Sequence, residues 1–387
     1  MGHLTYNTRL VFDSDSDKEL VMKMLEAQQL AWNQCSITRF RDVTKNSIVD
    51  LHKAFYRKFR DAHPEIPAQI VISAEQSVLS AYRSVKSNKH KIIIPCEKKK
   101  LSVRLDKRMY SVKLVDQKHV FSIISLTKRV KCGVQTYPKL QEHLDKYKFC
   151  DPELFVRDGD VWINLTFDIP TLLPKQTLAV GIDLGIRVFA ATSEGNIYID
   201  RKFNKEKRKL RYIKRCLKSK SKVSKSAKRH FKKLRHKEAN KNKSFTHNLV
   251  NQILCDTKAD VLVIEDLKGI KTKKNKFKNL NRISQIPFYQ FKQILTYKAA
   301  LLPEPKTVIS VNPRFSSQID SVTGKKEGVR KGRRFYSLSG KVYDAELNAA
   351  VNIAKRSKHP VSCGNILDGQ ASVRGLNVVG SSITSCR

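Results

Sequence analysis

The sequence has no long apolar run, no paired cysteines and few acidic residues. No stretch reaches the roughly eighteen consecutive apolar residues of a membrane-spanning helix, and the N-terminus lacks the basic-then-apolar layout of a secretory signal. The eight cysteines stand singly without a C-x-x-C pair, which excludes a four-cysteine zinc ribbon and a disulfide-stapled scaffold. These absences predict a soluble intracellular protein.

Acidic residues are scarce relative to basic ones. The chain has 35 Asp and Glu against 76 Lys and Arg, a formal net charge of +41. A compact protein with this excess repels itself unless a polyanion neutralises it, and nucleic acid is the expected polyanion. Because 40% of its 387 residues are hydrophobic, the chain can still build the cores of two or three domains. We expect a folded cytoplasmic protein that binds nucleic acid and is associated with the nucleoid.

The N-terminal half changes from strand to helix and back to strand. A strand-like start at residues 6–12 precedes a Ser16-x-x-Glu19 capping box, which predicts the beginning of a helix. Helical spacing of apolar residues continues to about residue 89. Short alternating segments follow, the clearest at residues 161–168. This order predicts a β-barrel domain over residues 1–12 and 90–176 with a helical insert over residues 13–89.

The C-terminal half has the pattern of an α/β domain. Residues 178–183 and 261–264 are apolar on both faces, as in buried strands of an α/β sheet. Residues 187–192 and 196–199 predict two strands that follow the first in a meander. A helix at residues 288–300, a strand at 307–311 and a helix at 345–355 complete the pattern. The segment from residue 361 to 387 is rich in Gly and Ser and predicts a flexible tail.

Residues 201–245 carry 21 basic and two acidic residues with the spacing of long helices. A charge run usually marks a solvated helix face, but so one-sided a composition suits the phosphates of an RNA–DNA duplex, which proteins recognise by shape and charge. The lysine-rich residues 271–278 add a second basic patch. The candidate nucleic-acid-binding residues are Lys207, Arg208, Arg211, Lys214, Arg215, Lys228, Arg229, Lys232, Lys233 and Arg235.

Two acidic residues, Asp183 and Glu265, each end an apolar strand. Side chains at the carboxyl ends of neighbouring strands converge at one edge of a sheet, and a third acid lies at the start of the helix from residue 345. Three converging acids repel one another unless divalent cations neutralise them, and a pair of Mg²⁺ ions held in this way is the usual device for phosphodiester hydrolysis. Each acid taken alone also has an ordinary explanation. Asp183 is explained as a turn residue before Gly185, and Glu265 as an ion-pair partner of Lys268.

The Gly-Ile-Asp-Leu-Gly segment around Asp183 has a second possible meaning. A similar strand and turn binds phosphate in the group of actin, Hsp70 and the sugar kinases. That group needs a second Asp-x-Gly turn and a Gly-rich adenosine loop downstream, and neither is present here. The large positive charge would also have no explanation in such a protein.

The motifs resemble, in order and spacing, those of the OrfB/TnpB proteins of bacterial insertion sequences, which are related to type V CRISPR effectors. The resemblance implies an α+β multidomain fold: an N-terminal, wedge-like β-barrel with a helical recognition insert, then an RNase H-like (RuvC) α/β nuclease domain. The nuclease domain would cover residues 177–312 and 341–360, with a basic helical insert at 201–257 and a degenerate zinc-ribbon loop at 313–340. The shared motifs are Gly-Ile-Asp183-Leu-Gly, Val-Ile-Glu265-Asp-Leu, Ser317-Gln318 after Asn312-Pro313, Arg334-Phe335 and the Asn-Ala-Ala-Val-Asn-Ile helix from Asn348.

The resemblance also implies a function. The protein would be a transposon-encoded, Mg²⁺-dependent DNA endonuclease whose partners are a guide RNA from the transposon end and double-stranded target DNA, with no membrane. One alternative is the same RNA-guided DNA-binding protein with weakened or lost nuclease activity, acting as a repressor. Another alternative, an RNA-binding protein of ribosomal type, explains the charge but not the two strand-end acids.

The third acidic motif departs from the family. Two residues before Asn348, where the family usually has Asp, this chain has Glu346. The resemblance therefore assigns Mg²⁺ binding and catalysis to Asp183, Glu265 and Glu346, with Asp344 as the substitute; Asp344 is better explained as the N-cap of the helix. A Glu carboxylate lies about 1.5 Å further from the backbone, in a kind of site whose metals are about 3.5–4 Å apart. Cleavage is therefore less certain to be retained than binding.

A second departure concerns zinc. Asp320, Thr323, Tyr336 and Ser339 stand where the family has four cysteines, and these side chains cannot form a thiolate cage. We predict that the purified protein contains no stoichiometric zinc, as measured by elemental analysis. One zinc ion per chain would show that these positions are misaligned with the family's ribbon.

Overall fold

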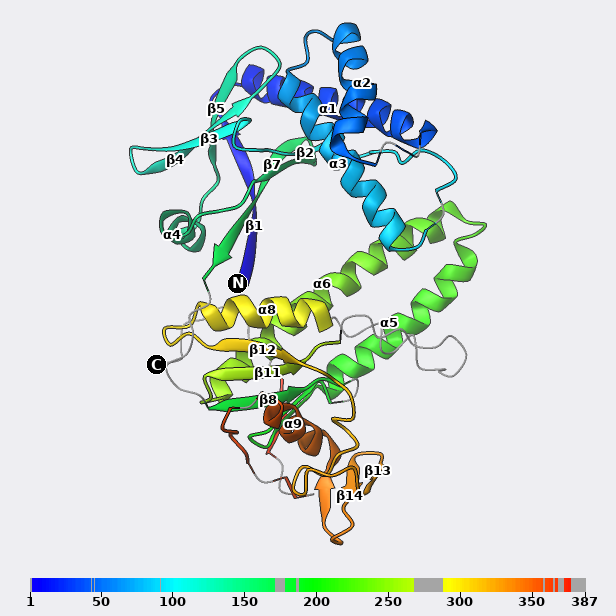
Figure 1. The fold of residues 1–387 in the computed structure, drawn as a ribbon, viewed down its shortest axis with the longest axis vertical. Coiled ribbons are helices and arrows are strands. Elements are labelled where there is room, and N and C mark those ends of the chain that lie inside the picture. Colours follow the sequence, from blue (N-terminus) through cyan, green and yellow to red (C-terminus); the bar gives the residue numbers. More distant parts are fainter. Residues whose placement is uncertain are drawn as a thin grey trace. The chain divides into compact units, whose positions relative to one another are not determined.

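The computed structural model describes residues 2–42, 44, 46–90, 92–170, 178–185, 188–267, 288–357, 359–364, 366–367 and 372–376. The chain divides into two compact units, an N-terminal unit of residues 3–168 and a C-terminal unit of residues 169–387 with residues 1–2. The fold is mixed α/β and multidomain, as predicted, and each unit is described by itself (Figure 1). No helix in the described ranges has both the length and the apolarity of a membrane span.

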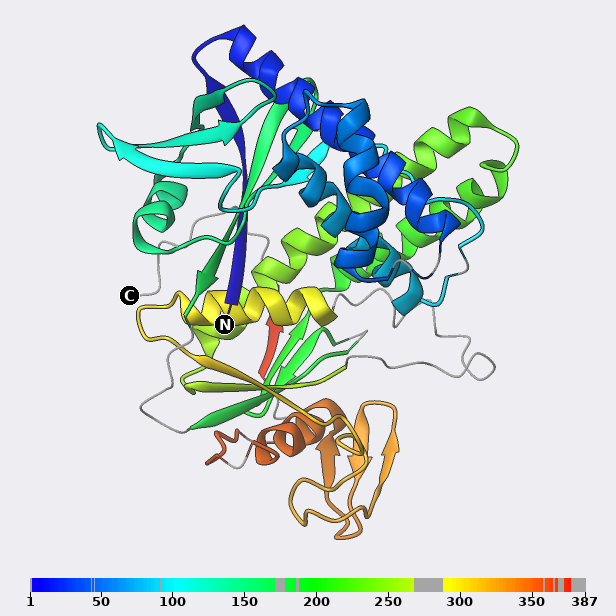
Figure 2. The same ribbon diagram turned by 45° about the horizontal axis from the view of Figure 1, so that its top comes forward.

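A curled, seven-stranded sheet in the order β2-β6-β7-β1-β5-β4-β3 forms the N-terminal unit (Figure 2). Its strands are β1 (Gly2–Phe12), β2 (Ser102–Arg104), β3 (Tyr110–Val115), β4 (Lys118–Ile124), β5 (Arg129–Val134), β6 (Glu153–Arg157) and β7 (Asp160–Ile169), and helix α4 (Pro138–Lys146) lies between β5 and β6. Strand β7 buries every second side chain, from Val161 to Phe167. The predicted alternation at residues 161–168 is confirmed.

Three helices lie between β1 and β2: α1 (Asp15–Arg41), α2 (Ile48–Ala62) and α3 (Ala68–Ser87). The predicted capping box is wrong by two residues, because Ser14, not Ser16, is the N-cap of α1 and its hydroxyl accepts a hydrogen bond from the Asp17 backbone N–H at 3.2 Å. Both serines are followed three residues later by an acid, so the sequence pattern could not separate them. Trp32 and Tyr82 are buried among the helices, as packing residues rather than exposed stacking platforms.

The C-terminal unit is built on a six-stranded sheet in the order β12-β11-β8-β9-β10-β16. Strands β8 (Ala179–Asp183), β11 (Val261–Glu265) and β12 (Thr307–Val311) are parallel to one another. Strands β9 (Ala190–Thr192) and β10 (Asn196–Ile199) continue from β8 as an antiparallel meander, as predicted. Strand β16 (Ser372–Gly375) pairs in parallel with β10 along the sheet edge, so part of the predicted tail belongs to the sheet; its last residues, 377–387, lie outside the described ranges.

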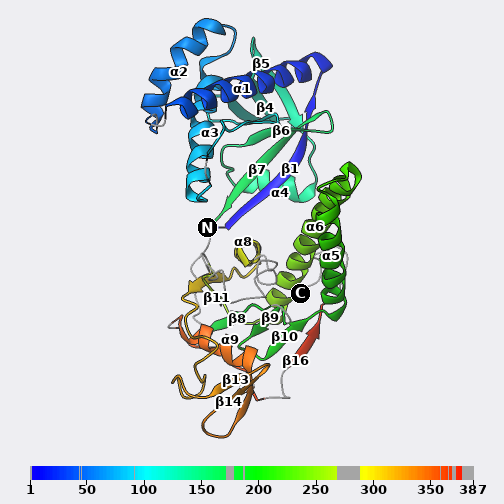
Figure 3. The same cartoon turned by 90° about the vertical axis from the view of Figure 1, so that its right-hand side faces the viewer.

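Helices cover both faces of this sheet (Figure 3). On one face, α6 (Lys225–Asp256) and α8 (Phe288–Ala300) pack against the even-numbered residues of β8 and β11, such as Val180 and Leu262. On the other face, α9 (Ala345–Lys355) packs against the odd-numbered ones, including Ala179 and Val261 through Ile353. The predicted helices at residues 288–300 and 345–355 are confirmed. Successive side chains of a strand point to opposite faces of the sheet. This alternation therefore determines the face to which the side chains of Asp183 and Glu265 point.

Gly181 in the middle of β8 lets α9 approach the sheet closely. A Cβ atom at this position would lie 2.0 Å from the Ala350 carbonyl oxygen and 2.6 Å from the Ala354 backbone nitrogen, where only glycine fits. The glycine before Asp183 is therefore required by helix packing, and it keeps the beginning of α9 close to the end of β8.

The loop between β12 and α9 contains a small antiparallel sheet of β13 (Val329–Lys331), β14 (Arg334–Tyr336) and β15 (Val342–Asp344). Gly324 and Gly340, the glycines after the two pairs of positions where the family has cysteines, both have positive φ, at 73° and 80°. The turns of the predicted degenerate ribbon thus keep backbone conformations that suit glycine. Asp320, at the first of these positions, is buried, and its backbone bonds to Lys325 and Gly324 close the first turn.

Candidate active site and basic hairpin

Asp183 and Glu265 lie side by side at the carboxyl end of the sheet. Strands β8 and β11 are parallel and in register, with Ile182 opposite Ile264, so the next residues of the two strands are neighbours. Both acids have odd numbers and therefore point to the face that α9 covers. The side chain of Glu346, in the first turn of α9, meets them there. The structure brings together the three acids that the sequence selected.

The Asp183 carboxyl is the most strongly perturbed of the three. Burial raises its pKa well above the usual range, and the charges of Glu346 and Glu265 and a hydrogen bond with Glu346 raise it further. The charge of Arg330 acts in the opposite direction. Perturbed carboxyls that share one site are typical of functional centres. Without a cation, the ionised form of Asp183 is strongly disfavoured.

Glu265 is held by the loop that follows β12. The Ser316 hydroxyl donates a hydrogen bond to Glu265 Oε1. Burial raises the pKa of Glu265, while the Ser316 hydrogen bond and the charge of Arg356 lower it. Glu265 thus has a neutral donor that orients one oxygen.

Glu346 and Asp344 have different roles in this structure. Asp344 is the N-cap of α9, because its Oδ1 accepts hydrogen bonds from the backbone N–H of Glu346 at 3.0 Å and of Leu347 at 3.3 Å, and its Oδ2 pairs with Arg333 at 3.0 Å. The N-cap prediction is confirmed. Glu346, in contrast, points toward Asp183 and forms an ion pair with Arg330 of β13 at 2.8 Å.

The residues present suit a divalent cation by their donor chemistry. Three carboxylates lie near one another, and Mg²⁺ prefers carboxylate oxygens. Burial and the charges of Glu346 and Glu265 raise the pKa of Asp183, and a bound cation would favour its ionised form. Among the described residues, no three Asp, Glu, His or Cys side chains are arranged around a single point. Arg330 contacts one oxygen of Glu346 and Ser316 contacts one oxygen of Glu265, so each carboxylate keeps a second oxygen for a cation.

Sequence reasoning missed Arg330 and Ser316. Arg330 is one of many basic residues, and nothing in its local pattern distinguishes it. Ser316 directly precedes the Ser317-Gln318 motif, which was the only available signal.

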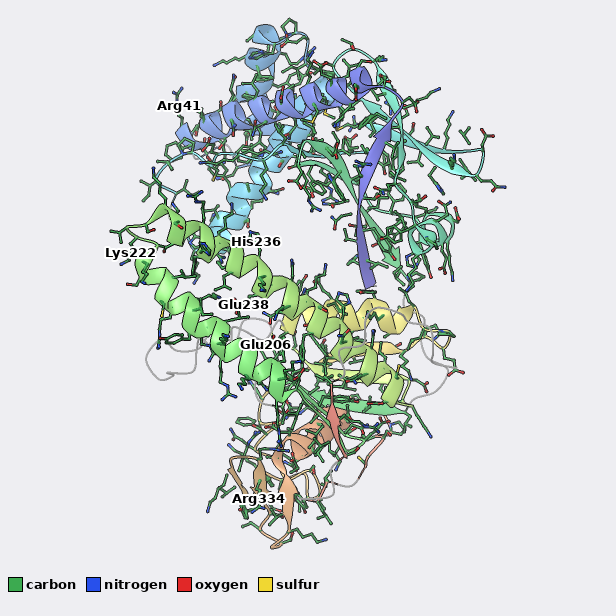
Figure 4. All side chains as sticks on the ribbon, turned by 180° about the vertical axis from the view of Figure 1, so that it is seen from behind. Arg41, Glu206, Lys222, His236, Glu238 and Arg334 are labelled. Carbon is green, nitrogen blue, oxygen red and sulfur yellow. The ribbon has the colours of Figure 1, made fainter. Side chains whose placement is uncertain are left out.

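The basic segment forms a helical hairpin of α5 (Arg201–Lys220) and α6. The two acids of residues 201–245, Glu206 and Glu238, pair across the hairpin with Lys241 at 2.7 Å and with Lys214 at 2.5 Å (Figure 4). At its base, the Phe203 and Phe245 rings stack with centroids 4.0 Å apart. The hairpin is therefore held by reciprocal ion pairs and an aromatic contact.

The ten candidate nucleic-acid-binding residues divide into two groups. Lys207, Arg211 and Lys214 are partly buried; Lys207 lies over the Phe203 ring with Nζ 5.4 Å from the centroid, and burial lowers its pKa. Lys214 also joins the two helices through its ion pair with Glu238. The others are exposed to solvent: Arg208, Arg215, Lys228, Arg229, Lys232, Lys233 and Arg235. The lysine-rich patch at residues 271–278 lies outside the described residues.

Two family models match parts of the chain. Residues 163–276 match OrfB_IS605, described as "Probable transposase", and residues 288–353 match the Cas12f1-like TNB domain. The resemblance to the OrfB/TnpB family is confirmed. The OrfB-like segment contains Asp183, Glu265 and the basic hairpin, and the TNB-like segment contains Glu346 and Arg330. No curated protein sequence matches the chain at a significant level.

Solved structures share the fold. Cas12f1, in its complex with sgRNA and target DNA, is similar with a TM-score of 0.60 and 14% identity, covering 89% of this chain and 84% of that chain. C2c1 of Alicyclobacillus acidoterrestris, in complex with single-guide RNA, has a TM-score of 0.39 and 11% identity, covering 89% of this chain and 67% of that chain. The first similarity establishes a Cas12f1-like fold for this OrfB-like chain, and the second is too low to support an argument.

We predict that Asp183→Asn stabilises the metal-free protein increasingly as the pH rises. Because the folded pKa of Asp183 is raised, the unfolded chain binds fewer protons, and ionisation destabilises the fold from the ordinary carboxyl pKa upward. Thermal unfolding in EDTA should therefore show a gain in Tm that is small near pH 4 and larger near pH 8. Asp158→Asn, at an exposed turn, is the control and should leave Tm unchanged. A gain at pH 8 no larger than at pH 4 would contradict the raised pKa of Asp183.

Proposed function

We propose that this protein is a transposon-encoded, RNA-guided DNA endonuclease whose RuvC-like acidic triad is Asp183, Glu265 and Glu346. The observation that carries the proposal is the convergence of these three acids on one face of the sheet. A meander of β8, β9 and β10 followed by parallel β11 and β12 is the strand order expected of an RNase H-like domain. The domain bounds follow the sequence assignment: barrel at 1–12 and 90–176, helical insert at 13–89 and nuclease domain at 177–312 and 341–360.

In this proposal the acids hold Mg²⁺, which when bound supplies the Lewis-acid chemistry of phosphodiester hydrolysis. Asp183 would be ionised in the metal-bound protein, because a cation would offset the burial and the neighbouring charges that raise its pKa. Ser316 orients Glu265 through its hydroxyl. Arg330 pairs with Oε1 of Glu346, so this guanidinium and a metal ion would compete for the same carboxylate.

The proposed partners are a guide RNA from the transposon end and double-stranded target DNA. Support comes from the net charge of +41 and from the exposed basic residues of the α5–α6 hairpin, which suit backbone phosphates. The similar Cas12f1 structure is a complex with sgRNA and target DNA. Recognition of a guide–target duplex by charge and shape needs no base-specific side chains on this hairpin.

One observation favours the alternative of an RNA-guided DNA-binding protein with weakened or lost nuclease activity. Glu346 has one methylene more than the family's usual Asp, and its carboxylate is bound to Arg330 at 2.8 Å. A metal ion at this position would compete with that ion pair. A chain that binds its target without cutting it would act as a repressor.

We predict that the protein purified from cells carrying its gene and flanking DNA contains RNA enriched in the transposon end. The double variant Lys228→Ala/Lys232→Ala should bind RNA more weakly. The slope of log affinity against log salt concentration should fall by about 1 for each phosphate contact that is lost. Lys214→Ala is the comparison: Lys214 is partly buried and paired with Glu238, so its loss should reduce the slope less than the loss of an exposed lysine. Sequencing the bound RNA and titrating it against salt are the measurements. Random cellular RNA without this enrichment would refute the guide.

A cleavage assay separates the nuclease from the alternative. We expect Asp183→Ala and Glu265→Ala to abolish Mg²⁺-dependent cleavage of a matched DNA target while guide affinity stays within about twofold. Glu346→Asp should lower the Mg²⁺ requirement or raise the rate, and Glu346→Ala should remove activity. Asp344→Ala should cost roughly 1 kcal/mol of stability because the helix loses its cap, with the cleavage chemistry retained.

The outcomes of that assay are distinct. Loss of cleavage in Asp344→Ala, with Glu346→Ala still active, would move the third ligand to Asp344. An inert parent that Glu346→Asp activates would identify the natural protein as the RNA-guided binder. Full activity in Asp183→Ala or Glu265→Ala would refute the metal site.

A further inference from the structure

Helix α9 carries a polar stripe that contacts the loop of residues 312–321. Asn348 Nδ2 donates to the Ile319 carbonyl oxygen at 2.8 Å, and Asn348 Oδ1 accepts from the Ser321 backbone N–H at 2.8 Å. Asn352 Nδ2 donates to the carbonyl oxygens of Ser316 at 2.9 Å and Ile319 at 2.7 Å. Both asparagines are buried, at 0% and 5% exposure.

The stripe extends to the end of the helix. Lys355 Nζ donates to the Ser321 carbonyl oxygen, and the Arg356 guanidinium donates to the carbonyl oxygens of Asn312 and Arg314. Residues 348, 352, 355 and 356 recur at helical spacing and therefore share one face. We call these four side chains, with the loop that they bind, the α9 clamp. It holds the loop from its first residue to its last.

The clamp leads directly to a candidate metal ligand. Ser316, whose carbonyl oxygen accepts from Asn352, donates its own hydroxyl to Glu265 Oε1. Ser316 is buried, at 6% exposure, and its hydroxyl lies closer to Glu265 Oε1, at 2.5 Å, than to its other acceptor, the Pro313 carbonyl oxygen, at 3.3 Å. The helix that presents Glu346 to the site therefore also determines where the partner of Glu265 stands.

We propose that Asn352 and Ser316 are positioning residues of the acidic site: Asn352 fixes the backbone of Ser316, and the Ser316 hydroxyl orients Glu265 for a divalent cation. Asn348, Lys355 and Arg356 fix the rest of the loop. This inference rests on the proposed function, because it assigns the orientation of a metal ligand.

The α9 clamp also explains what holds this loop in place. In the OrfB/TnpB family the same region carries zinc-binding cysteines. Asp320, at the first such position, makes local contacts: its Oδ1 accepts from the Val322 backbone N–H at 2.8 Å, and its backbone closes the turn at Gly324. The longer-range contacts come from buried amides of α9. Buried hydrogen bonds to backbone groups are costly to break, because the orphaned group stays desolvated.

The test measures Mn²⁺ binding to the full-length, metal-stripped protein by electron paramagnetic resonance of the free ion. The variants are Ser316→Ala, Asn352→Ala and the double variant; Ser317→Ala, at the next residue, is the matched control. Removing a partner that orients a metal ligand typically weakens metal binding about tenfold or more, so each single variant should lose about tenfold. Asn352 acts on Glu265 only through Ser316. The double variant should therefore bind Mn²⁺ with nearly the same affinity as the weaker-binding single variant. Ser317→Ala should stay within about twofold.

Thermal unfolding distinguishes a variant that has lost the orientation of Glu265 from one that has lost its fold. Ser316→Ala should leave Tm within a few degrees of the parent while losing Mn²⁺ affinity, and this variant alone decides the proposal if Asn352→Ala does not fold. Unchanged Mn²⁺ affinity in Ser316→Ala overturns the inference and leaves the proposed function standing. Losses that multiply in the double variant overturn the serial arrangement. A parent that binds no Mn²⁺ contradicts both the inference and the metal site of the proposed function.

Discussion

The burial of the Asp183 carboxyl beside two further carboxylates is the constraint around which the C-terminal unit is organised. Asp183, Glu265 and Glu346 are brought within each other's electrostatic influence by two parallel strands and one helix, and the pKa of Asp183 rises well above its usual range as a result of burial and of these neighbouring charges. A fold that needed only stability would separate these acids or pair each with its own base. Gly181 instead lets α9 pack closely on β8, and the first turn of that helix places Glu346 beside Asp183.

Helix α9 connects the parts of this site. Its N-terminus is capped by Asp344, its first turn presents Glu346, and its apolar face packs on the sheet through Ile353. Its polar stripe fixes the loop whose Ser316 contacts Glu265. A short helix with these functions tolerates little change of register, and a shift by one residue would move the acid and the amides away from their partners together.

The basic hairpin of α5 and α6 stays folded despite its high positive charge. Glu206 and Glu238 both join α5 to α6, and the exposed basic residues of the hairpin, such as Lys228 and Lys232, face solvent. Charge repulsion along the helices is offset locally by these two ion pairs and by the stacked Phe203 and Phe245 rings. The hairpin can therefore be both strongly basic and folded.

The sequence by itself determined the elements and the acids. Apolar strands ending in Asp183 and Glu265, the helix beginning near Asp344 and the long basic helices were all predictable, because local periodicity and capping depend on neighbouring residues. It did not distinguish Ser14 from Ser16 as a cap, since both carry an acid at the third following position, and it did not reveal that residues 372–375 pair with β10. Only the tertiary structure placed Arg330 on Glu346, Ser316 on Glu265 and Asn352 on Ser316. These contacts join residues 16 to 51 positions apart, and such pairings leave no periodic trace in the chain because they are decided by how the sheet, the loop and α9 pack together.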